Sequence, residues 1–164
     1  MNALIIYHTI TGHSRRAAED VAEGLASEGA AARLLLARDM SQWDVADVDI
    51  VVVGSPCHAG SLAIRAGVAG PILGVLNKLT GPALAGIVAG AFAVHSAYGG
   101  RRTVQAIENC LRAAGATVPA PGVVVKAGVP FSLFTGPKAS DKTRDELRQL
   151  GRTLAQAAQA GGER

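Results

Sequence analysis

Short apolar runs alternate along the chain with longer segments in which apolar residues recur at helical spacing. The short runs are too brief for helices and are rich in aliphatic residues, so they predict strands that are buried on both faces. Strands are predicted over residues 3–7, 32–37, 49–54, 86–94 and 117–126. Helices are predicted from Ser14 onward and over residues 72–79, 102–114 and 141–160.

Capping residues set the expected limits of these helices. Gly29 and Gly115 follow two of the helical segments, where a residue in the left-handed conformation commonly ends a helix. Pro71 suits the first turn of the second helix, because the missing N–H has no intrahelical acceptor there. Ser140 or Asp141 is expected to cap the last helix through its side-chain oxygen.

The alternation of strands and helices predicts an α/β fold. We expect one domain over residues 1–164, arranged as a three-layer sandwich with helices on both faces of a parallel sheet. Pro119 and Pro121 interrupt the fifth strand, which places that strand at an edge of the sheet. In such folds, ligands bind beyond the carboxyl ends of the strands.

Three short loops directly follow strands, and we expect them to meet at the carboxyl ends of those strands. They cover residues 9–14, 54–60 and 95–100. The first loop combines the hydroxyls of Thr9, Thr11 and Ser14 with the backbone N–H groups at the start of a helix. The positive end of a helix dipole attracts anions, so this loop predicts a phosphate site.

Composition narrows the class of protein. The longest apolar run, residues 83–94, is shorter than the roughly 18 residues that a membrane span needs. No basic segment precedes the first apolar run, so a signal peptide is not expected. Cys57 and Cys110 are isolated from each other, which favours a reduced, cytoplasmic protein over a disulfide scaffold.

The charge is modestly basic, at +3 with an isoelectric point near 9.2. Arginines are scattered and aromatic residues make up only 4%, so a nucleic-acid partner is not predicted. Two arginine pairs nevertheless lie beside the expected site, Arg15 with Arg16 and Arg101 with Arg102. They either neutralise a phosphate or attract an anionic substrate or NAD(P)H, or they are ordinary solvated helix surface.

Other chemistries fit the loops less well. The four histidines lie in or beside these loops, but they come from separate loops without ligand-like spacing, so no metal is predicted. Cys57 precedes His58 and His95 precedes Ser96, yet neighbouring residues at a strand end point apart and do not form a catalytic pair. The glycine patterns of P-loop and dinucleotide-binding proteins are absent, and no catalytic residue is assigned.

The three loops resemble those of flavodoxins, in order and at the right strand ends. The first loop resembles the family's phosphate loop through the pattern Thr9-x-Thr11-Gly12-x-Ser14. The second is similar to the family's Gly-Ser-Pro-Thr loop, with the sequence Gly54-Ser55-Pro56-Cys57-His58-Ala59-Gly60. The third resembles the loop in which an aromatic residue precedes glycines, with the sequence Ser96-Ala97-Tyr98-Gly99-Gly100. Residues 121–126 and 150–152 also resemble the flavodoxin domains of A-type flavoproteins.

This resemblance implies a five-stranded parallel sheet in the order 2-1-3-4-5 and non-covalently bound FMN. Tyr98 is expected to stack on one face of the flavin and His58 to cover the other, with Gly60 near the flavin N5 atom. The resemblance assigns cofactor contacts to Thr9, Ile10, Thr11, Gly12, His13, Ser14, Ser55, Pro56, Cys57, His58, Ala59, Gly60, Ser96, Ala97, Tyr98, Gly99 and Gly100.

The implied function is electron transfer or flavin-dependent redox chemistry. The electron donor or acceptor is either a protein partner or a small molecule such as NAD(P)H or a quinone. The sequence therefore does not decide between an electron carrier and a reductase. Monomer and homo-oligomer also stay open. Cys57 stands where the family usually has Thr, and His58 stands where it has a large aromatic residue. These departures favour the alternative, a flavodoxin-fold binding or regulatory protein that has lost FMN.

Overall fold

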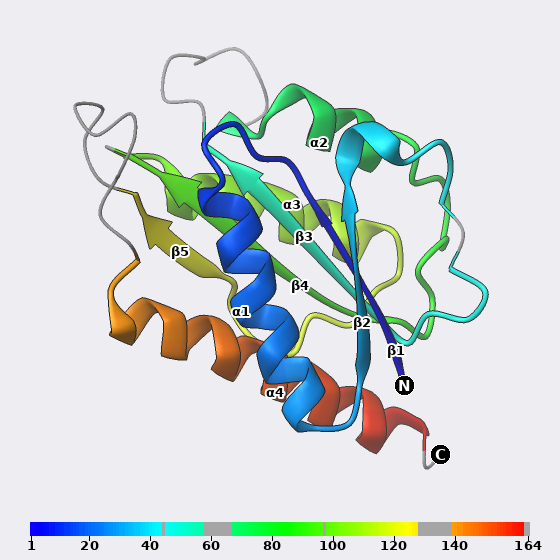
Figure 1. The fold of residues 1–164 in the computed structure, drawn as a ribbon. Helices are drawn as coiled ribbons and strands as arrows, with labels where there is room; N and C mark the ends of the chain where they lie inside the picture. Colours follow the sequence, from blue (N-terminus) through cyan, green and yellow to red (C-terminus); the bar gives the residue numbers. More distant parts are fainter. Residues whose placement is uncertain (44, 58–66, 97, 128–138, 163–164) are drawn as a thin grey trace.

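The computed structural model describes residues 1–43, 45–57, 67–96, 98–127 and 139–162. Its five strands form one parallel sheet in the order β2-β1-β3-β4-β5, as predicted (Figure 1). The strands are β1 (Asn2–Tyr7), β2 (Ala31–Leu36), β3 (Ile50–Pro56), β4 (Val88–His95) and β5 (Val123–Lys126). The helices are α1 (His13–Ser27), the short 3₁₀ helix η1 (Ala37–Asp39), α2 (Gly70–Leu76), α3 (Gly100–Ala113) and α4 (Asp141–Gly162).

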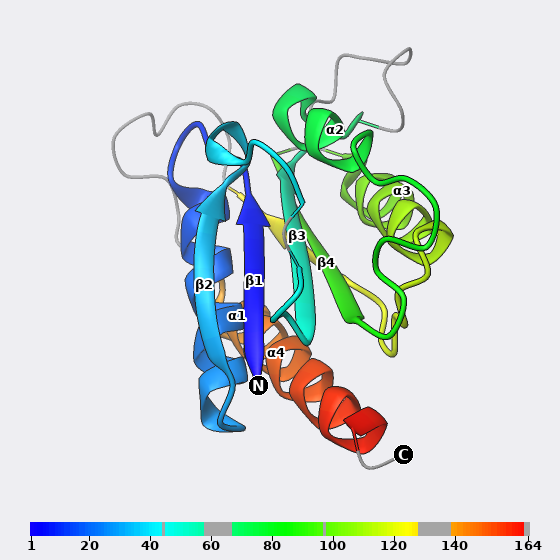
Figure 2. The same cartoon turned by 90° about the vertical axis from the view of Figure 1, so that its right-hand side faces the viewer.

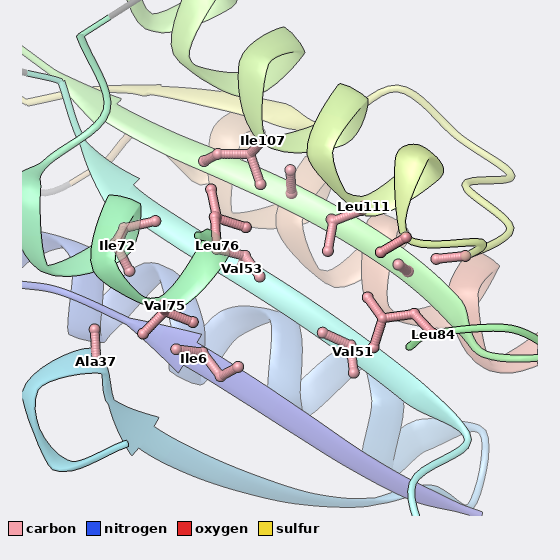
Figure 3. Close-up of a cluster of buried hydrophobic side chains, with 14 of the residues drawn as sticks. Ile6, Ala37, Val51, Val53, Ile72, Val75, Leu76, Leu84, Ile107 and Leu111 are labelled. Atoms are coloured by element: carbon pink, nitrogen blue, oxygen red, sulfur yellow. The ribbon is translucent and has the colours of Figure 1, made fainter. Parts of the chain in front are cut away.

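Helices cover both faces of the sheet, which confirms the three-layer prediction. Helices α1 and α4 lie on one face and α2 and α3 on the other (Figures 1 and 2). Neighbouring residues of each strand point to opposite faces, so one apolar run supplies two cores. Ile6 and Val53 pack under α2 and α3 (Figure 3), whereas Ile5 and Val52 pack under α1 and α4.

Helix α4 packs directly against α1 through two glycines. A Cβ at Gly24 would overlap the carbonyl of Arg148, and one at Gly151 would overlap the carbonyl of Val21. The two backbones are therefore in contact, which larger side chains would prevent. Because protein cores are close-packed, a larger side chain at either glycine would push the two helices apart.

An ion-pair network extends this contact between the two helices. Asp20 is 4% exposed and accepts hydrogen bonds from Arg144 Nε at 3.1 Å and Nη2 at 3.0 Å. Arg148 donates to Glu23 at 2.8 Å. The hydrogen bonds that Arg144 donates to Asp20 raise the pKa of Arg144, and the hydrogen bond that Arg148 donates to Glu23 raises the pKa of Arg148. Both guanidinium groups are thus held in their charged form.

Local signals placed most helix ends correctly. Gly29 and Gly115 have φ values of 79° and 90°, and each follows the end of a helix as predicted. Ser140 caps α4, since its hydroxyl accepts the Thr143 N–H at 3.2 Å. Within the described residues, no helix is both long and apolar enough to cross a membrane.

Three predicted boundaries were wrong for physical reasons. The fourth strand begins at Val88, because Gly86 adopts a left-handed turn with φ 83°. The fifth begins at Val123, and Thr117 forms only an isolated bridge to Val88, since the intervening prolines cannot donate to a ladder. Helix α2 ends at Leu76, after which the N–H groups of residues 78 and 79 bond three residues back in a tighter turn.

Candidate functional site

The described parts of the three predicted loops lie at the carboxyl end of the sheet. Strands β1, β3 and β4 are adjacent and parallel, so their carboxyl ends point the same way. The His8 N–H donates to the Gly54 carbonyl at 3.2 Å, which continues the pairing of β1 with β3 up to the start of the first loop. The Cys57 N–H donates to the Val94 carbonyl at 2.7 Å, which continues the pairing of β3 with β4 into the second loop. The parallel topology therefore brings these segments together.

The first loop turns through Gly12 into α1. Thr9 Oγ1 accepts the Gly12 N–H at 3.0 Å, which closes the loop. Gly12 has a φ of 84°, and an added Cβ there would meet no atom of the described residues within 4 Å. The glycine is thus required by its backbone conformation and leaves open space next to the helix end.

Helix α1 presents unpaired donors at this loop. Its first backbone hydrogen bond runs from the Arg16 N–H to the Gly12 carbonyl at 3.1 Å, so the N–H groups of residues 13–15 have no intrahelical acceptor. Ser14 is 2% exposed, and its hydroxyl has no hydrogen-bond partner within the described part of the chain. Together these donors suit an anionic oxygen.

The second loop is fixed by internal bonds. Ser55 is fully buried, and its hydroxyl donates to the Pro56 carbonyl at 2.8 Å and accepts the Ala69 N–H at 3.0 Å. That side chain therefore holds the start of α2 against β3. Phe92 fills the space above Gly54, where a Cβ would overlap its ring. Neither contact was predicted from the sequence, because both join residues far apart along the chain.

Cys57 faces the third loop. Its thiol donates to the Tyr98 carbonyl at 3.5 Å, and a Cβ added to Gly99 would lie 2.9 Å from Sγ. Gly99 has a φ of 93°, and its carbonyl accepts the Thr103 N–H at 3.0 Å as α3 begins. The sulfur thus packs between the two loops, where the family's usual hydroxyl residue would stand. The sequence alone carried no signal for this pairing.

Ile10 and Tyr98 are the large hydrophobic residues that are exposed among those the structure describes, at 69% and 67%. They lie in the first and third loops. Ser96 is exposed as well, whereas Gly100 is buried against the His95 ring. His95 Nδ1 is buried and has no hydrogen-bond partner among the residues that the structure describes.

Several predicted contacts lie outside the described residues. These are His58, Ala59, Gly60 and Ala97, so the expected flavin cover at His58 and the N5 contact at Gly60 are not located. Of the side chains that the structure does describe, no group of three or more His, Cys, Asp or Glu is arranged to hold a metal ion.

The fold and the first loop define an α/β protein with a parallel sheet and with backbone N–H donors at the carboxyl ends of its strands. The family model described as flavodoxin matches residues 5–130. The chain is also 31% identical over 159 residues to a flavodoxin of Aquifex aeolicus, which covers 93% of this chain and 84% of that protein. The chain therefore belongs to the flavodoxin family, and its cofactor is FMN.

Solved structures support the same fold. An archaeal flavodoxin superposes with a TM-score of 0.76 at 18% identity, covering 97% of this chain and 99% of that one. The rubredoxin oxygen:oxidoreductase of Desulfovibrio gigas gives a TM-score of 0.80 at 21% identity, covering 98% of this chain. This chain spans 36% of the length of that oxidoreductase.

The residues present fit FMN. A terminal phosphate needs several donors and close backbone approach, which the end of α1 and the open space at Gly12 offer. A flavin ring needs a flat apolar wall, which the exposed ring of Tyr98 offers. Cys57 leaves this fit intact, because its thiol is directed at the third loop. The alternative of a fold that has lost FMN gains no support from these contacts or from the relatives.

Proposed function

We propose that this flavodoxin is an electron carrier that exchanges electrons with a protein partner through FMN held by the loops after β1, β3 and β4. The observation that carries the proposal is the pair of backbone bonds from the His8 N–H to the Gly54 carbonyl and from the Cys57 N–H to the Val94 carbonyl, which extend the strand pairing to the point where the loops begin. FMN, when bound, supplies a centre that accepts and gives up electrons one or two at a time. The protein's part is to bind, orient and expose that centre.

The first loop is proposed to bind the phosphate. Thr9 shapes the loop by accepting the Gly12 N–H, and the hydroxyl of Ser14 donates to a phosphate oxygen. The N–H groups at the start of α1 add further donors, and their dipole favours the negative charge. Thr11 is exposed beside them and can contribute a third hydroxyl.

The second and third loops are proposed to bind the flavin ring. Tyr98 provides a stacking wall, and the thiol of Cys57 holds the backbone of that wall through the Tyr98 carbonyl. Ile10 and Tyr98 are both strongly exposed, so the ring bound between these loops would lie close to the protein surface. Exposure of this kind suits electron exchange with another protein, which needs only approach to the ring edge.

The experiment begins with the purified protein. Its visible spectrum should show oxidised flavin, and the apoprotein should regain that spectrum when titrated with FMN. Once chemically reduced under anaerobic conditions, the holoprotein should pass electrons to cytochrome c. A colourless protein that does not take up FMN would overturn the proposal.

A second assay separates a carrier from a reductase. The holoprotein is mixed with NADH or NADPH and with a series of quinones, and steady-state turnover is followed. A carrier should show slow turnover with all of these small molecules and faster transfer to a protein oxidant. Saturable turnover with one nicotinamide nucleotide and one quinone would instead establish a reductase.

A further inference from the structure

Four exposed arginines stand at the beginnings of the two helices that follow the first and third loops. Arg15 and Arg16 are the third and fourth residues of α1, and Arg101 and Arg102 are the second and third of α3. The first turns of both helices lie within the described residues and contain no acidic side chain. Helices α1 and α3 cover opposite faces of the sheet (Figures 1 and 2). The two pairs therefore lie on opposite sides of the proposed cofactor site at the carboxyl ends of the strands.

Arginine is electrostatically unfavourable at the start of a helix. A helix N-terminus carries partial positive charge, so it favours Asp or Glu and disfavours a cation. Two adjacent cations at each of two helix starts therefore oppose local stability. Sequences break local rules of this kind mainly at functional sites.

The arginines are only partly neutralised. Arg15 pairs with Glu19 at 3.0 Å, and Arg101 donates to the Gly122 carbonyl at 3.3 Å while sharing a hollow with Glu146. Arg16 and Arg102 form no ion pair with any residue that the structure describes. The pair on α1 also lies nearest the proposed phosphate site, so the pair on α3 is the clearer probe of a further role.

Exposed apolar side chains precede both arginine pairs along the chain. Ile10 and Tyr98 belong to the loops that lead into α1 and α3, and both are about two-thirds exposed, at 69% and 67%. An apolar centre with a charged periphery is the usual composition of a protein–protein interface. One helix N-terminus is enough to bind a single anionic group of a small molecule. Two separated arginine pairs instead suit the extended surface of a protein.

We infer that this surface, the basic rim formed by Arg15, Arg16, Arg101 and Arg102 around Ile10 and Tyr98, docks an electron-transfer partner with an acidic face. The inference rests on the proposed carrier function and adds the charge of the partner. Complementary charge steers partners together and accelerates association, most strongly at low salt. The net charge of +3 acts in the same direction.

The test compares two protein oxidants of opposite charge. The reduced holoprotein is mixed in a stopped-flow instrument with native cytochrome c, which is basic, or with exhaustively succinylated cytochrome c, which is acidic. Rate constants are measured between about 0.01 M and 0.15 M ionic strength, where the Debye length falls from about 30 to 8 Å. With the acidic oxidant, the rate should fall by about tenfold or more as salt rises, and with the basic oxidant it should rise or stay level.

Two double variants separate the rim from the overall charge. Arg101→Glu with Arg102→Glu changes the rim, and Arg33→Glu with Arg152→Glu changes β2 and α4. Each lowers the net charge by four, from +3 to −1. The α3 variant should still bind FMN, and it should lose the higher rate at low salt that the unchanged protein shows with the acidic oxidant. The matched variant should keep most of it.

Other outcomes would overturn the inference in distinguishable ways. Equal losses in the two double variants would mean that only net charge matters. A faster reaction with native cytochrome c, or an α3 variant that is impaired only in reduction by NADPH, would assign the arginines to something other than an acidic protein. A holoprotein that reduces neither oxidant would refute the carrier function itself.

Discussion

The thiol of Cys57 lies 3.5 Å from the carbonyl oxygen of Tyr98 and thereby joins the loop after β3 to the loop before α3. The sulfur also packs on Gly99, at 2.9 Å from where a Cβ would stand. A residue that replaces the family's usual threonine thus contacts protein on the side of the third loop. Its effect on FMN is expected to be indirect, through the position of Tyr98.

Cys57→Ala should therefore loosen FMN binding. Loss of one hydrogen bond costs about 0.5–1.5 kcal/mol, so the FMN dissociation constant should rise by about two- to tenfold. Cys57→Ser should restore most of the affinity, because its hydroxyl can donate to the same carbonyl. The visible circular dichroism of the flavin should change in the alanine variant and recover in the serine variant. Equal affinities in all three proteins would show that the link has no influence on the cofactor.

Ser14→Ala tests the phosphate site. A hydrogen bond to a charged group contributes about 1.5–3 kcal/mol, so FMN affinity should fall by about tenfold or more. Affinity for riboflavin, which has no phosphate, should not change. Ser27→Ala is the matched control, because Ser27 lies at the other end of α1 and donates to the Gly24 carbonyl at 2.7 Å. Parallel losses of FMN and riboflavin affinity in Ser14→Ala would argue against a phosphate contact.

Gly24→Ala should destabilise the fold strongly. The new methyl would overlap the backbone of Arg148, so α4 must move away from α1, and overpacking of this kind costs about 1–3 kcal/mol or more. Gly74→Ala is the control, because a Cβ there would meet nothing within 4 Å. Urea unfolding of both variants measures the difference. A Gly24→Ala protein as stable as the control would mean that the helices are not in backbone contact.

Arg144→Gln should lower stability by an amount that is independent of pH near neutrality. The hydrogen bonds that Arg144 donates to Asp20 raise the pKa of Arg144, so its pKa in the folded protein lies above that in the unfolded chain. The stabilisation is then fully present below the unfolded pKa and is lost only as the pH rises through the folded pKa. Urea unfolding of both proteins between about pH 6 and 9 should give a constant difference, since arginine stays charged throughout that range. A difference that shrinks between these limits would assign the effect to another group.

The fold could be predicted because its signals are local and repeated. The apolar runs that became β1, β3 and β4 have the length and composition of strands buried on both faces, and Gly29 and Gly115 end helices by a conformation that depends on one residue. The predicted ends of strands and helices were wrong where tertiary contacts or a single backbone torsion determined them. Gly86 continues an apolar run in the sequence, yet its positive φ keeps it out of β4.

The site was predictable in outline and not in its contacts. The sheet topology alone brings the loops together, so their order along the chain was enough to predict one shared edge. The bonds from Ser55 to Ala69 and from Cys57 to Tyr98 span 14 and 41 residues. Such contacts depend on side-chain packing in three dimensions, for which a single sequence gives no periodic signal.

The inward orientation of the Ser55 hydroxyl has a consequence for altering this protein. That group is committed to Ala69 and Pro56, and the main chain of both residues is part of the β3 ladder, where Gly54 is paired with Tyr7 and Phe92 and Ser55 with Ala93. Main-chain donors keep the same chemistry whatever residue carries them. Attempts to retune the cofactor at these two positions would therefore act by reshaping the polypeptide and not by exchanging one functional group for another.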